Sequence, residues 1–153
     1  MDEKSLFTKF WINESKTTAK VLERIPENSS YKPDPNSRTA QDIAWQIVAE
    51  EKMIMEALET GNVTWAPGKM PASMKEVTDI YVKQSADIAK RWEALPAEKW
   101  NGELDFFGHP SPGSAMAWSF LFDLVHHRGQ ISTYLRPMGA KVPRIYGPSF
   151  DEP

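Results

Sequence analysis

The chain is divided into four segments with helical periodicity, and this division constrains its fold more than any other feature. Apolar residues recur every three or four positions in each of the segments 4–25, 38–60, 73–95 and 114–136. The helix-breaking residues that follow them are, in order, Pro26, Gly61, Pro96 and the pair Pro137 and Gly139. Proline lacks the N–H that a helix interior needs, and glycine readily takes the left-handed conformation that closes a helix. We therefore expect four helices of about 20 residues each.

Local signals also indicate where these helices begin. Ser37 is expected to cap the second helix, and Ser73 with Glu76 forms a candidate capping box for the third. Residues 101–112 show no strand-like alternation, so we expect an irregular connection there, and an extended tail after the last helix. The economical arrangement is all-α, a four-helix bundle formed by a single domain over residues 1–153. The loop lengths allow either an up-down-up-down path or one with a long crossover.

Composition excludes several classes of function. The net charge is −3 and the isoelectric point is near 5.6, so we expect no basic surface of the kind that neutralises nucleic-acid phosphates. The sequence has no run of about 18 apolar residues and no basic amphipathic helix, which argues against contact with a membrane. The absence of cysteine removes thiolate metal ligands and a cysteine nucleophile. The acidic start, with no apolar stretch behind it, favours a cytoplasmic location.

Polar residues interrupt the apolar faces of the second and fourth segments. On a helical wheel with about 100° per residue, Glu50 falls within the apolar stripe of the second segment, and Gln46 lies one turn before it. His127 falls within the stripe of the fourth segment, with Asp123 one turn earlier, while His126 points to the outer side. Each segment therefore presents an i, i+4 pair of polar residues, and the four side chains converge if the two helices are neighbours.

A buried carboxylate needs a partner, and this requirement allows two interpretations of the cluster. A bound divalent cation would supply the partner, whereas a hydrogen-bonded core network with Asp123 paired to His127 would supply it without a metal. Glu14 of the first segment also falls within an apolar stripe and can reach the cluster from a third side. His109, which lies in the connection before the fourth segment, is expected to be solvated.

The fourth segment contains a distinctive run of residues. It consists of His126-His127-Arg128-Gly129-Gln130-Ile131, followed by Tyr134-Leu135-Arg136-Pro137-Met138-Gly139. The second segment and the tail add Thr39-Ala40, Asp42-Ile43-Ala44-Trp45, Val142-Pro143 and Tyr146-Gly147-Pro148. This pattern resembles the DinB / YfiT-like family over nearly the whole chain. The resemblance implies a four-helix bundle, often dimeric, that holds a divalent metal such as zinc or nickel.

The resemblance also implies which residues bind the metal. Family members use one ligand on the second helix and two ligands four residues apart on the fourth, and these positions correspond to Gln46, Asp123 and His127. Gln46 stands where a histidine is commonest, and an amide oxygen is a poorer ligand for zinc or nickel than imidazole. The affinity is therefore expected to be lower unless Glu50 takes over as a ligand.

The function implied by the resemblance is metal-dependent thiol transfer or hydrolysis of small electrophiles or toxic compounds. Glu50 would act as the general base or as a further ligand, and any thiol must be an external, low-molecular-weight one because the chain has no cysteine. The alternative is a non-catalytic ligand-binding or stress-response protein with a degenerate metal site. A ferritin-like di-iron centre is disfavoured, because the sequence contains no Glu-x-x-His.

A second apolar side of the fourth segment predicts a homodimer. It consists of Trp118, Phe122 and Val125 and includes Gly129, and the second segment adds Trp45 and Val48 outside its core face. A monomer would expose a larger apolar patch than soluble proteins usually carry. In the alternative interpretation, the long loops or the C-terminal tail cover these residues.

Overall fold

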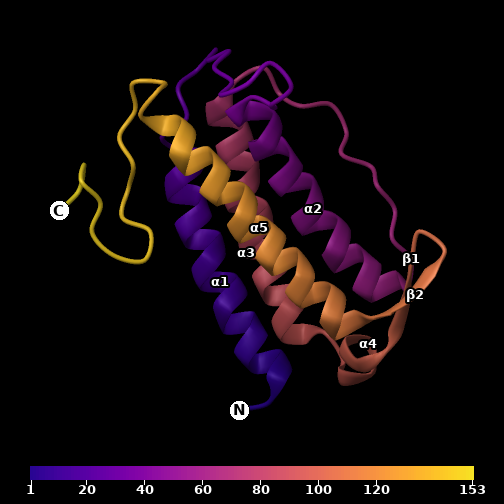
Figure 1. Ribbon diagram of the computed structural model, residues 1–153. Helices are drawn as coiled ribbons and strands as arrows, with labels where there is room; N and C mark the ends of the chain where they lie inside the picture. Colours follow the sequence, from indigo (N-terminus) through magenta and orange to yellow (C-terminus); the bar gives the residue numbers. More distant parts are fainter.

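Four long helices lie side by side in the structure, a computed structural model that describes residues 1–153 (Figure 1). They are α1 (Glu3–Leu22), α2 (Ala40–Thr60), α3 (Met74–Ala94) and α5 (Gly113–Leu135). Each packs against two others, so that the order around the bundle is α1, α5, α2, α3. The segment between α2 and α3 runs back along the bundle, which makes α2 parallel to α3 and antiparallel to α5 (Figure 1). The predicted four-helix bundle is confirmed, and its path contains one long crossover.

The helix ends follow local chemistry, with two corrections to the prediction. Gly61 closes α2 with a φ of 86°, and Ser73 caps α3 by accepting a hydrogen bond from the backbone N–H of Glu76. The predicted capping box at Ser73 is only half formed, because the Glu76 side chain makes no return hydrogen bond to Ser73. The cap of α2 is Thr39 and not Ser37. Thr39 forms a reciprocal capping box with Asp42, whereas the residue three positions after Ser37 is an alanine and cannot complete such a box.

The connection between α3 and α5 is more regular than expected. It contains a short helix, α4 (Ala97–Asn101), and a hairpin formed by β1 (Glu103–Phe106) and β2 (His109–Pro112). The hairpin turn is formed by Phe107 and Gly108, both with positive φ, as a two-residue turn between twisted strands requires. The prediction of an irregular connection was wrong because proline in β2 and phenylalanine in the turn hide the usual strand and turn signals.

The core consists of 28 buried apolar residues contributed by all the helices and by β1. Aromatic rings of α1, α3 and α4 meet at one end of the bundle, where the ring centroid of Phe7 lies 4.7 Å from that of Trp92 and 5.0 Å from that of Trp100. Leu6 and Phe10 of α1 lie outside this core and are exposed. None of the helices is both long and apolar enough to cross a membrane.

A buried ion pair joins α1 to α5 and holds the C-terminal tail. The Arg128 guanidinium is 2% exposed and donates to the Glu14 carboxylate and to the Tyr146 hydroxyl. Tyr146 lies in the tail, which runs beside α1 in Figure 1, and its hydroxyl donates to Glu14 at 2.7 Å. The tail thus depends on the same buried pair that fixes α5 against α1.

The second apolar side of the fourth segment exists, although part of it is covered. Phe122 is 65% exposed and stacks on the half-buried ring of Trp118, with 6.1 Å between the ring centroids. Val125 and Trp45 are half-buried, and Val48 is buried rather than on the outside, because α3 packs over that turn of α2. The expected homodimer stays a prediction, with Phe122 as its most exposed apolar residue on α5.

Candidate metal centre

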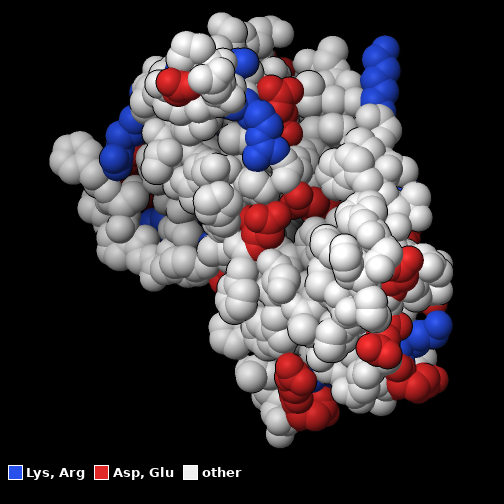
Figure 2. All heavy atoms as spheres, turned by 45° about the vertical axis from the view of Figure 1, so that its right-hand side comes forward, with Lys and Arg blue, Asp and Glu red and all other residues white.

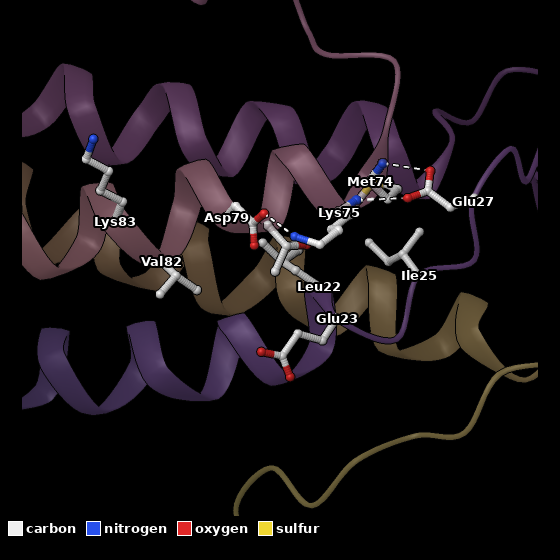
Figure 3. A pocket seen from close by; sticks show the side chains of 10 residues that line it. Leu22, Glu23, Ile25, Glu27, Met74, Lys75, Asp79, Val82 and Lys83 are labelled. Atoms are coloured by element: carbon white, nitrogen blue, oxygen red, sulfur yellow. Dashed lines mark hydrogen bonds and ion pairs between the residues drawn. The ribbon is translucent and has the colours of Figure 1, made fainter.

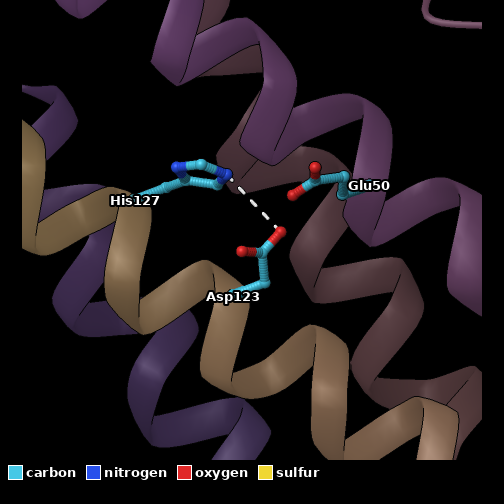
Figure 4. Close-up of side chains that lie close together, drawn as sticks. All are labelled: Glu50, Asp123 and His127. Atoms are coloured by element: carbon cyan, nitrogen blue, oxygen red, sulfur yellow. Dashed lines mark ion pairs between the residues drawn. The ribbon is translucent and has the colours of Figure 1, made fainter.

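The antiparallel contact between α2 and α5 brings the four predicted site residues together. α2 supplies Gln46 and Glu50, and α5 supplies Asp123 and His127. One ligand atom from each of Glu50, Asp123 and His127 lies within 4.8 Å of the other two (Figure 4). Glu50 and His127 are buried, whereas the Asp123 side chain is 41% exposed. The cluster is therefore enclosed on the core side and reaches solvent beside Asp123.

A hydrogen bond to Gln130 fixes the orientation of His127. The ring atom Nδ1 lies 2.8 Å from the Gln130 amide oxygen Oε1, which can only accept a hydrogen bond. Nδ1 therefore carries the proton, and Nε2 presents its lone pair to the cluster. This is the tautomer that a metal-ligating histidine needs, held by the kind of outer hydrogen bond that such ligands normally have.

The surroundings of Glu50 disfavour the charged form of its carboxyl group. Burial raises its pKa to about 7, and the nearby charge of Asp123 adds to this effect, while a hydrogen bond from Gln46 opposes it. Its oxygen Oε2 is buried and has no hydrogen-bond partner. A buried carboxylate oxygen without a partner costs free energy that a cation at this position would remove.

The donor set fits a divalent cation, and the spacing of one pair of its ligand atoms matches a tetrahedral site. A tetrahedral site with bonds of about 2.1 Å separates its ligand atoms by about 3.4 Å. His127 Nε2 and Asp123 Oδ2 are 3.4 Å apart. One imidazole nitrogen and two carboxylate oxygens are suitable ligands for zinc, nickel, iron or manganese ions.

The amide of Gln46 makes two contacts inside the cluster. Its nitrogen Nε2 donates to Glu50 Oε1 at 2.5 Å and lies 2.9 Å from His127 Nε2. The amide nitrogen has no lone pair for a cation, so in this orientation Gln46 is a hydrogen-bond donor. Its assignment as a metal ligand, which came from the family resemblance, stays a prediction.

The other polar residues singled out in the sequence lie outside the cluster. His126 is exposed on the outer side of α5, as the helical wheel predicted, and His109 is exposed in β2. Glu14 is buried as expected, but it does not reach the cluster, because Arg128 holds it between α1 and α5.

Sequence reasoning missed a second buried carboxylate, Glu51. It is 1% exposed, and its oxygens accept hydrogen bonds from Trp11, Ser15 and Gln84 at 3.2 to 3.3 Å. Burial raises its pKa to about 7, and these hydrogen bonds oppose the rise. The consecutive glutamates Glu50 and Glu51 were the available signal. Neighbouring helix residues point about 100° apart, so Glu51 had to face a different neighbour from the one that Glu50 faces. With three donors around it, Glu51 is satisfied by the protein itself.

A surface pocket of about 550 Å³ lies away from the cluster. It lies between the end of α1 and the start of α3 (Figure 3). Three of its charged side chains are paired, since the Glu27 carboxylate accepts from the backbone N–H groups of Met74 and Lys75, and the Lys75 ammonium pairs with Asp79. The pocket is also lined by Glu23 and Lys83, and none of its residues belongs to the cluster. Figure 2 shows acidic side chains in a hollow near the middle of the face that it presents.

Comparisons with known proteins agree with this architecture. Uncharacterized protein YrdA of Bacillus subtilis (strain 168) is 28% identical over 152 residues, which cover 95% of this chain and 89% of that protein. Uncharacterized protein YjoA of the same organism is 22% identical over 133 residues, which cover 84% of this chain and 86% of that protein.

Solved structures show the same fold. The crystal structure of a DinB-like protein from Bacillus cereus ATCC 10987 matches with a TM-score of 0.79 and 27% identity, covering 92% of this chain and 95% of that one. The crystal structure of YjoA matches with a TM-score of 0.78 and 20% identity, covering 93% and 98%, and supports the fold alone. The model of the DinB family matches residues 1–153. Since that match covers every residue, the chain belongs to the DinB family.

Proposed function

We propose that this protein is a metal-dependent enzyme that acts on small molecules, either as a thiol S-transferase or as a hydrolase. The observation that carries the proposal is the convergence of Glu50, Asp123 and His127, with a buried oxygen of Glu50 that has no partner. The membership in the DinB family supports a metal at this place, and the solvent-exposed side beside Asp123 gives a small molecule access.

The geometry of the cluster assigns a separate role to each residue. Asp123 and His127 would hold the cation, which would supply Lewis acidity that lowers the pKa of a thiol or a water molecule. Glu50 would be either the third ligand or the group that takes up the proton, since its carboxylate lies beside both of them.

In thiol transfer, the sulfur of an external thiol forms a bond to an electrophilic carbon of the second substrate. The bond between that carbon and its leaving group breaks, the electron pair stays with the leaving group, and the thiol proton passes to Glu50. In hydrolysis, water takes the place of the thiol. The thiol must be external, because the chain has no cysteine.

The test is metal-restored activity. Protein stripped with a chelator is reloaded separately with zinc, nickel, manganese or ferrous ions, and is assayed with cysteine plus a chromogenic aryl halide, and with an activated ester. We expect one of these ions to restore turnover, and His127→Ala to abolish it while His126→Ala retains it. Turnover that is equal in stripped and reloaded protein would contradict the proposal.

One variant separates the two roles of Glu50. If Glu50 is a ligand, Glu50→Gln weakens metal binding, and activity falls only because the metal is lost. If Glu50 is the proton acceptor, Glu50→Gln retains the metal, while the rate falls at saturating substrate.

A non-catalytic ligand-binding or stress-response protein is the second candidate. The observation in its favour is Gln46, whose amide nitrogen donates to Glu50 and contacts His127, so that the cluster is partly satisfied without a cation. This candidate predicts that the reloaded protein shows no turnover with either class of substrate.

A further inference from the structure

We propose that Gln46 competes with the cation for the cluster and does not act as a metal ligand. The inference rests on the proposed metal site and concerns what limits its affinity. Gln46 Nε2 lies 2.9 Å from His127 Nε2 and also donates to Glu50 Oε1. The amide nitrogen therefore occupies the His127 lone pair that a cation between α2 and α5 would use, and it holds one of the two oxygens of Glu50.

The orientation of the amide follows from its neighbours. Glu50 presents a carboxylate oxygen, and His127 presents a lone pair because its proton is on Nδ1, which donates to Gln130. Both neighbours are acceptors, and the amide NH₂ group has two N–H donors to satisfy them. The reverse orientation would place the amide oxygen against a carboxylate oxygen and a nitrogen lone pair, which repel it.

The competition is strict at His127. An imidazole nitrogen has a single lone pair, so Nε2 can accept the Gln46 N–H or bind a cation, but not both. Glu50 Oε1 is less restrictive, because a carboxylate oxygen has further lone pairs. Every cation that reaches His127 must therefore break the hydrogen bond from Gln46.

The position of Gln46 allows this exchange. Gln46 is half-buried, whereas Glu50, one helical turn later on α2, is buried, so the Gln46 side chain has access to solvent and can rotate away from the cluster. The expected consequence is a site of reduced affinity that releases its cation readily. Gln46 would thus determine how tightly the site holds metal, through a bond that the cation must replace.

The test compares two matched substitutions on the same helix. Gln46→Leu removes both N–H donors, and Gln41→Leu makes the same change in the first turn of α2, outside the cluster. Binding of zinc and of manganese is measured by isothermal titration at the same pH and in the same buffer for all three proteins. We expect Gln46→Leu to bind at least about tenfold more tightly than the wild type, equivalent to about 1.4 kcal/mol, and Gln41→Leu to bind like the wild type.

A second measurement follows the amide itself. The side-chain NH₂ resonances of Gln46 are identified by their loss in Gln46→Leu, in ¹H–¹⁵N spectra of the chelator-treated wild type. We expect them to differ from those of exposed glutamines and to move to ordinary positions when zinc is added. Resonances that do not change on zinc binding would overturn the proposed competition.

The outcomes distinguish this inference from the proposed function. If the wild type binds metal and Gln46→Leu binds more weakly, Gln46 is a ligand, and the competition is refuted while the metal site stands. If neither the wild type nor Gln46→Leu binds zinc or manganese, the metal site itself is refuted, and the competition with it.

Discussion

Two adjacent histidines on α5 give a sharp test of the metal centre, because the structure assigns them opposite surroundings. His127 is 5% exposed and faces the cluster, whereas His126 is exposed and its ring centroid lies 5.2 Å from that of His127. The perturbation is the replacement of each histidine in turn. His127→Ala and His127→Gln both remove the imidazole, and His127→Gln keeps a hydrogen-bonding group of similar size, so a folding defect can be separated from loss of a ligand.

The expected magnitude follows from what each side chain touches. Loss of a hydrogen-bonding partner of a metal-ligating histidine alone typically weakens metal binding about 10- to 100-fold. Removal of His127, which supplies the only imidazole among the three candidate ligands, is therefore expected to weaken binding at least about 100-fold, or about 2.7 kcal/mol. Substitutions of exposed residues usually change stability by less than about 0.5 kcal/mol, so His126→Ala is expected to change affinity about twofold at most.

Isothermal titration with zinc measures both changes, and circular dichroism checks that each variant is folded. If His126→Ala loses the metal while both His127 variants keep it, the orientation of α5 is wrong. If all folded variants bind like the wild type, neither histidine is a ligand, and the reasoning from the cluster is refuted.

Three further predictions follow from other parts of the structure. Because burial raises the pKa of Glu51 from 4.5 when unfolded to about 7 when folded, its contribution to the free energy of unfolding should fall by up to about 3 kcal/mol as pH rises between these values and then level off, which urea titrations measure as the difference between the wild type and Glu51→Gln. Arg128→Met leaves Glu14 buried without its partner and should destabilise the protein by about 3 to 5 kcal/mol, and adding Glu14→Gln should recover part of this loss; an unchanged Tm would contradict it. Phe122→Glu should convert the expected homodimer into a monomer in sedimentation experiments, and a wild type that is monomeric at high micromolar concentration would refute the dimer.

Much of the bundle is predictable from the sequence, because its signals are local. Periodicity and breakers located all four long helices, Gly61 closes α2 as predicted, and Ser73 caps α3 although its capping box with Glu76 is only half formed. The hairpin escaped prediction because its stability depends on contacts distant in sequence. Asp105 of β1 pairs with Asn62 in the segment after α2, and no local pattern encodes that pairing.

The candidate site was also predictable only in part. Helical phase alone placed Glu50 and His127 on inner faces and His126 outside, since 3.6 residues per turn fixes these directions. It could not show that the Gln46 amide nitrogen lies between Glu50 and His127, because that depends on the orientation of the side chains. Nor could it show that Glu14 pairs with Arg128, because a helical wheel says nothing of the neighbouring helix.

The central claim is that a divalent cation binds between α2 and α5, and anomalous diffraction from crystals grown with zinc tests it most directly. The structure predicts a single strong peak within about 2.0 to 2.3 Å of His127 Nε2 and a carboxylate oxygen of Asp123, with Glu50 beside it. In the same crystals, Gln46 Nε2 should no longer lie within hydrogen-bonding distance of His127 Nε2. A cluster with no anomalous peak, in which Gln46 still donates to His127, would contradict the account.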